Sequence, residues 1–308
     1  MKPYRLENAS LETLEIATEI ANSWEKNIDP KFDGTSPEEL EMFVSRRADL
    51  VGHSLLMYPE GENAPQGFIG LLADPARGKY WTEIAVMPGS GYMESAVGEI
   101  IKQARSVNPQ WNLQPNVNDL DVEQVKAWES RGFEKIQTSY AMKKLELSAV
   151  YPELPHGASM RTLSSEEDWK SMHSLQQDAF EHHFGFVPRT LQDFKDFRLD
   201  SETFDPHGIH ILSLDGEDVG YVEVNNEIAS LNQGYVQGIG VKHSHQKTGL
   251  GKILLQWGFS YCALRGFDEV ELYVDIENKS GALRFYESAG MIAERTYNIY
   301  EKADWATK

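Results

Sequence analysis

The sequence predicts an α/β (α+β) protein made of two tandem copies of one fold, each a mixed, largely antiparallel sheet flanked by helices. Three observations lead to this prediction: the length of the chain, a repeat with a nearly constant offset, and the order of apolar patterns in the second half. At 308 residues the chain is longer than the about 100–200 residues of one typical domain. Two domains are therefore favoured over one.

Three short segments recur at offsets of 155 to 158 residues, which favours duplication over coincidence. The paired segments are residues 5–6 with 161–163, residues 86–88 with 241–243, and residues 132–133 with 290–291. Between the copies, Pro152, Pro155 and Gly157 interrupt regular structure. We therefore predict a degenerate N-terminal domain over residues 1–146, a linker over 147–157 and a catalytic domain over 158–308.

The second copy gives the clearest pattern of elements. Ser164 or Ser165, with Glu167 or Asp168 three residues later, resembles a capping box and predicts the start of a helix. Apolar runs over 209–214 and 219–224, on either side of an acidic turn with one glycine, predict a hairpin. Periodicity then predicts strands over 235–241, 270–274 and 296–300, and helices over 252–264 and 280–289, the last ended by Gly290. Antiparallel strands followed by a strand–helix–strand segment indicate a mixed sheet.

Composition excludes several classes of function. The net charge of −19 would repel nucleic-acid backbones and anionic lipid surfaces, so neither kind of partner is expected. The N-terminus has no apolar signal region, and no window approaches the ~18 apolar residues of a membrane-spanning helix. The single cysteine, Cys262, can form neither an internal disulfide nor a multi-thiolate zinc site. We expect a cytoplasmic monomer or homodimer without a metal.

One glycine-containing segment leaves a predicted strand and opens a predicted helix, where backbone N–H groups and the helix dipole favour an anion. It reads Gln246, Lys247, Thr248, Gly249, Leu250, Gly251, Lys252. A Walker loop is excluded because Gln246 replaces its first glycine and Ile253 follows Lys252. A dinucleotide fingerprint is excluded because Leu254 replaces its third glycine. By itself the segment fits a phosphate cradle and an ordinary strand-to-helix turn equally well.

A second motif after the next strand decides between these interpretations. The chain here resembles the GNAT superfamily of N-acetyltransferases, over roughly residues 158–300. The motif A loop of that family is matched by Gln246, Gly249 and Gly251, and its motif B is matched by Asn278, Ala282, Tyr286 and Gly290. Met291 replaces the usual phenylalanine. The duplication, together with residues 178–188, resembles the tandem mycothiol synthase-like subgroup, although Gly234 and Tyr235 stand where those enzymes carry a carboxylate.

The resemblance implies transfer of an acetyl group from acetyl-CoA to a primary amine of a small molecule or peptide, by direct attack in a ternary complex. It assigns the pyrophosphate to the backbone of the segment 246–252, and the pantetheine arm to Ile239, Gly240 and Val241. A backbone N–H near Val241 would polarise the thioester carbonyl. Tyr286 would protonate the leaving thiolate. Asn278 would contact the cofactor arm or cap the following helix.

The general base and the role of the first copy are less constrained. Alternation along its strand could turn Glu223 toward the substrate, although a solvated glutamate fits equally well. His182 and His183 could line the acceptor pocket, but they are consecutive and do not share a helix face. The first copy has Trp128 where the second has Tyr286, and an indole cannot supply that proton. The alternative function is a catalytically silent acyl-CoA-binding regulatory module.

Overall fold

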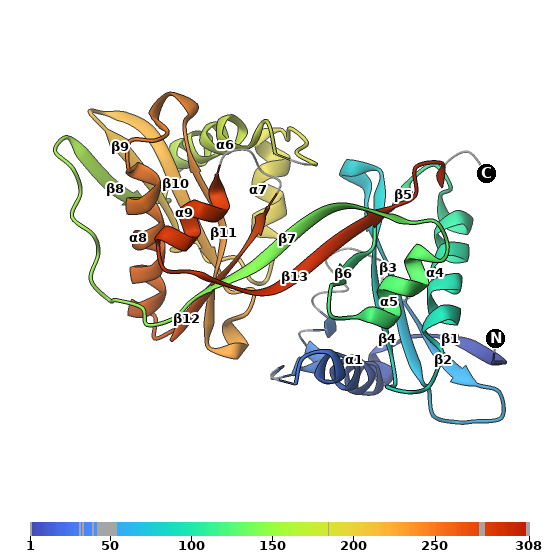
Figure 1. Cartoon of the computed structure of the whole chain (residues 1–308). Coiled ribbons are helices and arrows are strands. Elements are labelled where there is room, and N and C mark those ends of the chain that lie inside the picture. The colour runs from blue at the N-terminus through green and yellow to red at the C-terminus, as the bar shows by residue number, and fades with distance from the viewer. Residues whose placement is uncertain are drawn as a thin grey trace. The chain divides into compact units, whose positions relative to one another are not determined.

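The computed structural model describes residues 2–30, 32, 34–38, 40–41, 54–183, 185–276 and 281–305. Contacts divide the chain into two compact units, one formed by Met1–Thr138 with Thr296–Lys308 and the other by Ser139–Arg295. Two long strands, β7 (Glu134–Lys144) and β13 (Ile292–Glu301), contain residues of both units (Figure 1). Among the described helices, none combines the length and the apolar character needed to cross a lipid bilayer.

The first unit contains a five-stranded sheet in the order β1-β2-β3-β4-β5, with its last pair parallel and the others antiparallel. The strands of this sheet are β1 (Tyr4–Asn8), β2 (Ser54–Pro59), β3 (Gly67–Asp74), β4 (Lys79–Val86) and β5 (Asn112–Leu113). The unit also contains the short strand β6 (Asn116–Asn118), which lies outside this sheet. Its helices are α1 (Leu14–Ile28), α4 (Met93–Val107) and α5 (Val122–Glu129). Apolar side chains of α1, α4, α5 and the sheet form one core around Phe68, Tyr80 and Trp128.

The second unit repeats the same order of pairing, β8-β9-β10-β11-β12, again with only the last pair parallel within this series. Its strands are β8 (Ala158–Thr162), β9 (Ile209–Leu214), β10 (Glu217–Asn225), β11 (Gln233–Val241) and β12 (Glu269–Asp275). Its helices are α6 (Glu166–Phe180), α7 (Leu191–Leu199), α8 (Leu250–Leu264) and α9 (Ala282–Ser288). The duplicated fold predicted from the three repeated segments is confirmed by this shared connectivity.

The contacts do not follow the linear division at residues 146–158. Residues 139–144 of β7 pair with β12, and residues 297–299 of β13 pair with β6. Each copy's final strand therefore contributes its end to the unit built mainly by the other copy. The predicted linker is ordered against the second unit, because Tyr151 stacks on Trp257 and Ser260 donates a hydrogen bond to the Val150 carbonyl. Whether 1–146 and 158–308 act as separate domains stays a prediction.

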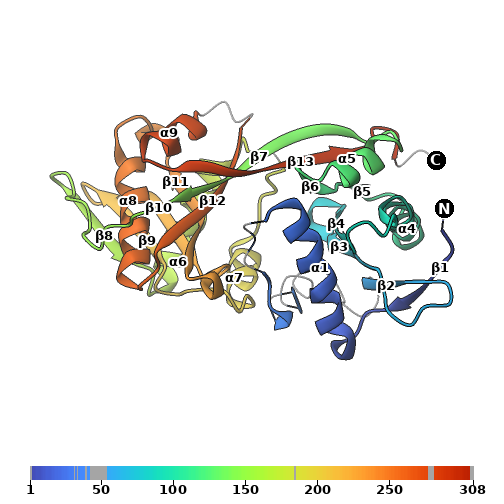
Figure 2. The ribbon, with the colours of Figure 1, turned by 60° about the horizontal axis from the view of Figure 1, so that its bottom comes forward.

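Two layers of helices cover the sheet of the second unit (Figures 1 and 2). Alternation along β10 sends Val222 and Val224 into the core beneath α8, and Tyr221 into the core beneath α6 and α7. The predicted local signals are confirmed. Ser165 and Asp168 form the capping box at the start of α6, and Gly290, with φ +79°, follows the end of α9. The amino end predicted for α9 at residue 280 lies outside the described residues.

Candidate active site

The phosphate-binding loop predicted from the sequence lies between β11 and α8. Lys247 and Gly249 both adopt left-handed backbone, with φ +62° and +91°, and this turns successive peptide groups in the same direction. Within the described part of the chain, the five backbone N–H groups of residues 247–251 have no hydrogen-bond acceptor. Two side-chain hydrogen bonds stabilise the loop. The Thr248 hydroxyl donates to the His245 carbonyl at 2.6 Å, and the Gln246 side-chain amide donates to the Val241 carbonyl at 3.2 Å. This arrangement suits an anion.

Strands β11 and β12 separate beside this loop. Among the described residues, their parallel register covers only Gln233 to Tyr235, although β11 continues to Val241 and β12 to Asp275. The Lys242 N–H donates to Val219 on β10. Because successive residues of an antiparallel strand point their N–H groups to opposite edges, the N–H groups of Val241 and Ile239 point toward the open edge. The gap thus offers main-chain donors to an extended ligand.

Tyr286 lies on α9, is buried with only 9% of its surface exposed, and packs in the same core as α8. Its neighbour Phe285 reaches the first turn of α8, where a Cβ added to Gly251 would lie 3.5 Å from the ring. Among the described residues the Tyr286 hydroxyl has no hydrogen-bond partner. Burial raises the pKa of Tyr286 to about 12, so the hydroxyl carries its proton at neutral pH.

Glu223 is buried, at 4% exposure, which excludes the solvated alternative. Its two carboxylate oxygens accept hydrogen bonds from Nε and Nη2 of Arg198 on α7, both at 2.8 Å. This bidentate pair stabilises the charged carboxylate and occupies both of its oxygens. Each oxygen keeps a second lone pair beside the bond from Arg198, and the assignment of Glu223 as the base stays a prediction.

Tyr221, on the same face of β10 as Glu223, was not identified from the sequence. Its ring lies over two glycines of β11: a Cβ on Gly240 would lie 2.8 Å from the ring, and a Cβ on Gly238 would lie 3.2 Å from the hydroxyl. Tyr221 is 1% exposed, and burial together with the charge of Glu223 raises its pKa. Tyr286 adds a smaller electrostatic effect on Tyr221. The glycine spacing in β11 was the only sequence signal for this contact.

Gly234, one of the two positions where the resemblance implied a carboxylate, has no space for a side chain. A Cβ on Gly234 would lie 2.4 Å from Cys262 Sγ on α8. The nearest buried carboxylate in the register is Glu271, which stands opposite Tyr235 on β12 and is bound by Arg295 at 2.6 Å. Burial raises the pKa of Glu271. Sequence analysis also missed this residue.

The remaining predicted residues divide into three cases. Asn278 lies outside the described residues. His183 is buried enough that its pKa is lowered, and it packs on Phe180 at the end of α6. His182 lies beside Glu181 and His243, and one potential metal-ligating atom from each side chain lies within 4.8 Å of the others. No metal site was expected at His182. All three side chains are exposed, so this group resembles a solvated surface cluster more than a preformed metal site.

The corresponding positions of the first copy differ in kind. Gly89 and Gly91 have left-handed backbone before α4, but the Ser90 carbonyl there accepts a hydrogen bond from Lys2 at 2.6 Å. Trp128 is fully buried and stacks edge-on against Phe133. That side chain contributes to the core of the first unit.

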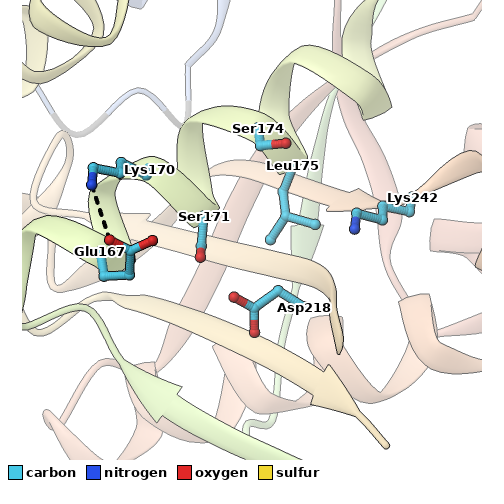
Figure 3. A pocket seen from close by; sticks show the side chains of 7 residues that line it. All are labelled: Glu167, Lys170, Ser171, Ser174, Leu175, Asp218 and Lys242. Atoms are coloured by element: carbon cyan, nitrogen blue, oxygen red, sulfur yellow. Dashed lines mark hydrogen bonds and ion pairs between the residues drawn. The ribbon is translucent and has the colours of Figure 1, made fainter. Parts of the chain in front are cut away.

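A surface pocket of about 300 Å³ opens along α6 (Figure 3). It is lined by Glu167, Lys170, Ser171, Ser174, Leu175, Asp218 and Lys242. Its main charges already have partners, since Arg161 binds Asp218 through two nitrogens and Lys242 binds Glu217. None of the predicted cofactor residues lines it, so this pocket is not the candidate active site.

Comparison with known proteins agrees with this geometry. Residues 169–291 match the family described as Acetyltransferase (GNAT) family. The mycothiol acetyltransferases of Thermobispora bispora and Streptomyces coelicolor are 36% and 33% identical over 143 and 151 residues, or 45% and 48% of this chain. These alignments span only 48% and 47%, about half, of the relatives' own length. The mycothiol acetyltransferase of Thermomonospora curvata aligns over 265 residues at 28% identity, covering 84% of this chain and 85% of that protein.

Solved structures resemble the whole chain. A GCN5-related N-acetyltransferase from Sphaerobacter thermophilus superposes with a TM-score of 0.82 at 21% identity, covering 98% of this chain and 96% of that one. A tandem GNAT protein from the clavulanic acid biosynthesis pathway gives 0.72 at 15% identity, covering 98% and 99%. At these identities the likeness shows the fold, and it confirms the predicted pair of GNAT-like copies.

Proposed function

Because residues 169–291 match the family described as Acetyltransferase (GNAT) family, we propose that the chain transfers an acetyl group from acetyl-CoA to a primary amine. The amine attacks directly while both substrates are bound, and CoA leaves as the free thiol. One observation carries this proposal: the five N–H groups of residues 247–251, at the amino end of α8, have no acceptor within the described part of the chain and follow the strand β11 that separates from β12.

The described residues fit the cofactor. The N–H groups of residues 247–251, with the amino end of α8, would hold the pyrophosphate. The N–H groups of Ile239 and Val241, on either side of Gly240, would hold the pantetheine arm as a further strand holds its neighbour. When bound, acetyl-CoA supplies an acetyl group as a thioester.

The chain's own groups would then perform two tasks. An N–H of β11 near Val241 would donate to the thioester carbonyl oxygen, where negative charge develops during attack. Tyr286 would deliver its phenolic proton to the departing sulfur. The raised pKa of Tyr286 lies above the reference pKa of a thiol, about 8.5. The phenol therefore keeps its proton until negative charge forms on the sulfur.

Removal of a proton from the amine falls to a carboxylate on the α6 and α7 face. Glu223 is the proposed base, acting through a lone pair that its two bonds from Arg198 leave free. Glu271, with its raised pKa, is the second carboxylate on β12 that could take this role. The first copy is proposed to shape the protein without catalysis, because Trp128 cannot replace the acidic tyrosine.

The relatives' names point to a small-molecule acceptor, and we propose an amine of that size. The acceptor is not assigned to mycothiol chemistry, because neither Gly234 nor Tyr235 supplies the carboxylate that the resemblance implies at this place. We propose a cytoplasmic monomer or homodimer.

The test is release of free thiol from acetyl-CoA with a panel of primary amines. The panel contains glucosamine, ethanolamine, spermidine, L-lysine and tyramine. Amine-dependent thiol release, with one acetylated product per thiol, is the expected result. Tight binding of acetyl-CoA without thiol release for any amine would favour the silent regulatory module instead.

A further inference from the structure

The position of Tyr221 in the second unit depends on two missing side chains. Gly238 and Gly240 lie on the face of β11 that the Tyr221 ring covers, and a Cβ on Gly240 would also lie 2.8 Å from Ala179 of α6. The ring therefore lies between α6 and a bare stretch of β11. Its hydroxyl comes next to Gly238, beyond Tyr235, where β11 has already left β12.

This hydroxyl lacks a partner although its residue is almost completely buried. Tyr221 is 1% exposed, and within the described part of the chain its oxygen makes no hydrogen bond. The oxygen is not among the fully enclosed polar atoms that lack a partner, so it keeps contact with open space. A polar group that arrives with a ligand would satisfy it.

The surroundings indicate which polar group fits. Among the charged groups near Tyr221, Glu223 has the strongest effect on its pKa. One carboxylate oxygen of Glu223 would lie 3.8 Å from a Cβ on Gly238. Arg198 neutralises that carboxylate through two hydrogen bonds, so the pair has no net charge. A group that donates N–H hydrogen bonds is therefore favoured over a full positive charge.

Tyr286 belongs to the same surroundings. Its hydroxyl also lacks a partner among the described residues, and α9, which carries it, packs against β12. Two unpaired phenols thus border the gap from different elements, one from β10 and one from α9.

We propose that the Tyr221 hydroxyl oxygen accepts an N–H hydrogen bond from the acceptor amine and positions its nitrogen beside the thioester. This inference rests on the proposed acetyltransferase function and assigns the acceptor side of that site. Tyr286 serves the leaving sulfur, and Tyr221 serves the incoming nitrogen in its uncharged form. Gly238 keeps free the space that this nitrogen occupies.

The test compares Tyr221→Phe with Tyr261→Phe in the full chain, using the amine of the panel with the highest kcat/KM. Tyr221→Phe keeps the ring over the two glycines and removes only the unpaired hydroxyl. We expect the amine KM to rise about tenfold, which corresponds to one lost hydrogen bond, while the acetyl-CoA KM and the melting temperature stay unchanged. Tyr261 donates to Asp205 at 2.6 Å, so its variant should lose melting temperature and keep both KM values.

Gly238→Ala is the second variant, and it leaves every hydroxyl in place. Its Cβ would lie 3.2 Å from the Tyr221 oxygen, in the space proposed for the nitrogen. We expect the amine KM to rise while acetyl-CoA binding, measured by calorimetry, stays unchanged. An unchanged amine KM in both variants of an active wild-type enzyme would overturn the role of Tyr221, whereas an inactive wild type would overturn the proposed function itself. A lowered melting temperature of Tyr221→Phe with an unchanged amine KM would make Tyr221 a structural residue.

Discussion

Replacement of Tyr286 by phenylalanine removes a single oxygen atom from the proposed site and leaves the ring in its core position. The hydroxyl has no hydrogen-bond partner among the described residues, so its loss leaves no buried group unpaired. We therefore expect the free energy of unfolding to change by less than about 1 kcal/mol.

Turnover should respond differently, because the same oxygen is proposed to carry the proton for the leaving sulfur. Loss of a general acid lowers kcat by about 10²–10⁴, which corresponds to about 3–5 kcal/mol in the barrier. Acetyl-CoA affinity should change little, since the pyrophosphate is proposed to bind the backbone of residues 247–251 and not Tyr286. The assay measures thiol release, calorimetric binding of acetyl-CoA and melting temperature on one preparation.

The pH dependence supplies a further check on Tyr286. Burial raises its pKa to about 12, above the unfolded value of about 10, so the folded state binds this proton more tightly. The stability that results is complete below about pH 10 and is lost as pH rises through 12. Between about pH 7 and 10, ionisation of Tyr286 should therefore not reduce turnover.

Tyr80→Phe is the matched control, because Tyr80 is also buried, at 1% exposure, and its hydroxyl has no partner among the described residues, but it lies in the core of the first unit. It should keep wild-type turnover and stability. If Tyr286→Phe turns over as fast as Tyr80→Phe, Tyr286 is not the acid and the proton must come from another group or from water.

Three further predictions concern the loop, the buried ion pair and a buried histidine. Gly249→Ala places a side chain at φ +91° and should weaken acetyl-CoA binding in calorimetry, whereas Gly89→Ala, at φ +73° and equally open, should not; equal losses would place binding in both copies. Arg198→Ala leaves Glu223 buried and unpaired and should lower the free energy of unfolding in urea by about 3–5 kcal/mol. The double variant Arg198→Met with Glu223→Leu should recover most of this loss. A loss below about 1 kcal/mol in Arg198→Ala would contradict a buried pair. Burial lowers the pKa of His210 from 6.5 to about 4, so about 3 kcal/mol of stability is present above pH 6.5 and is lost as pH falls through 4. Urea unfolding at pH 7 and at pH 4.5 should show this loss. His210→Leu should remove this part of the pH dependence.

Local signals could be read from the sequence because each one depends on neighbouring residues. The capping box of Ser165 and Asp168, the turn between β9 and β10, and the loop 246–252 are all short-range arrangements. The residue types fix them directly, through side-chain caps and backbone that only certain residues adopt readily. These local arrangements could be predicted for this reason, whereas the roles of the loop and of Tyr286 were proposed from the resemblance to the GNAT motifs.

The acceptor side of the site could not be read in this way. Arg198 reaches Glu223 across 25 residues, and α7, which carries Arg198, was not predicted. The Tyr221 ring lies over β11 only because two glycines of that strand, Gly238 and Gly240, have no side chains to collide with it. Such contacts depend on packing between elements, which sequence patterns of one element do not contain.

The exchange of strand ends explains why the linear repeat and the compact units differ. The repeat places β7 in the first copy, yet residues 139–144 complete the sheet of the second unit next to β12. In the same way, residues 297–299 pair with β6 and not within the second unit. A repeat in sequence records how the chain was built, whereas a unit of contacts records which hydrogen bonds and side chains hold together. Because β12 forms one border of the proposed acetyl-CoA gap, residues 139–144, which the repeat assigns to the first copy, lie next to the proposed site of the second copy.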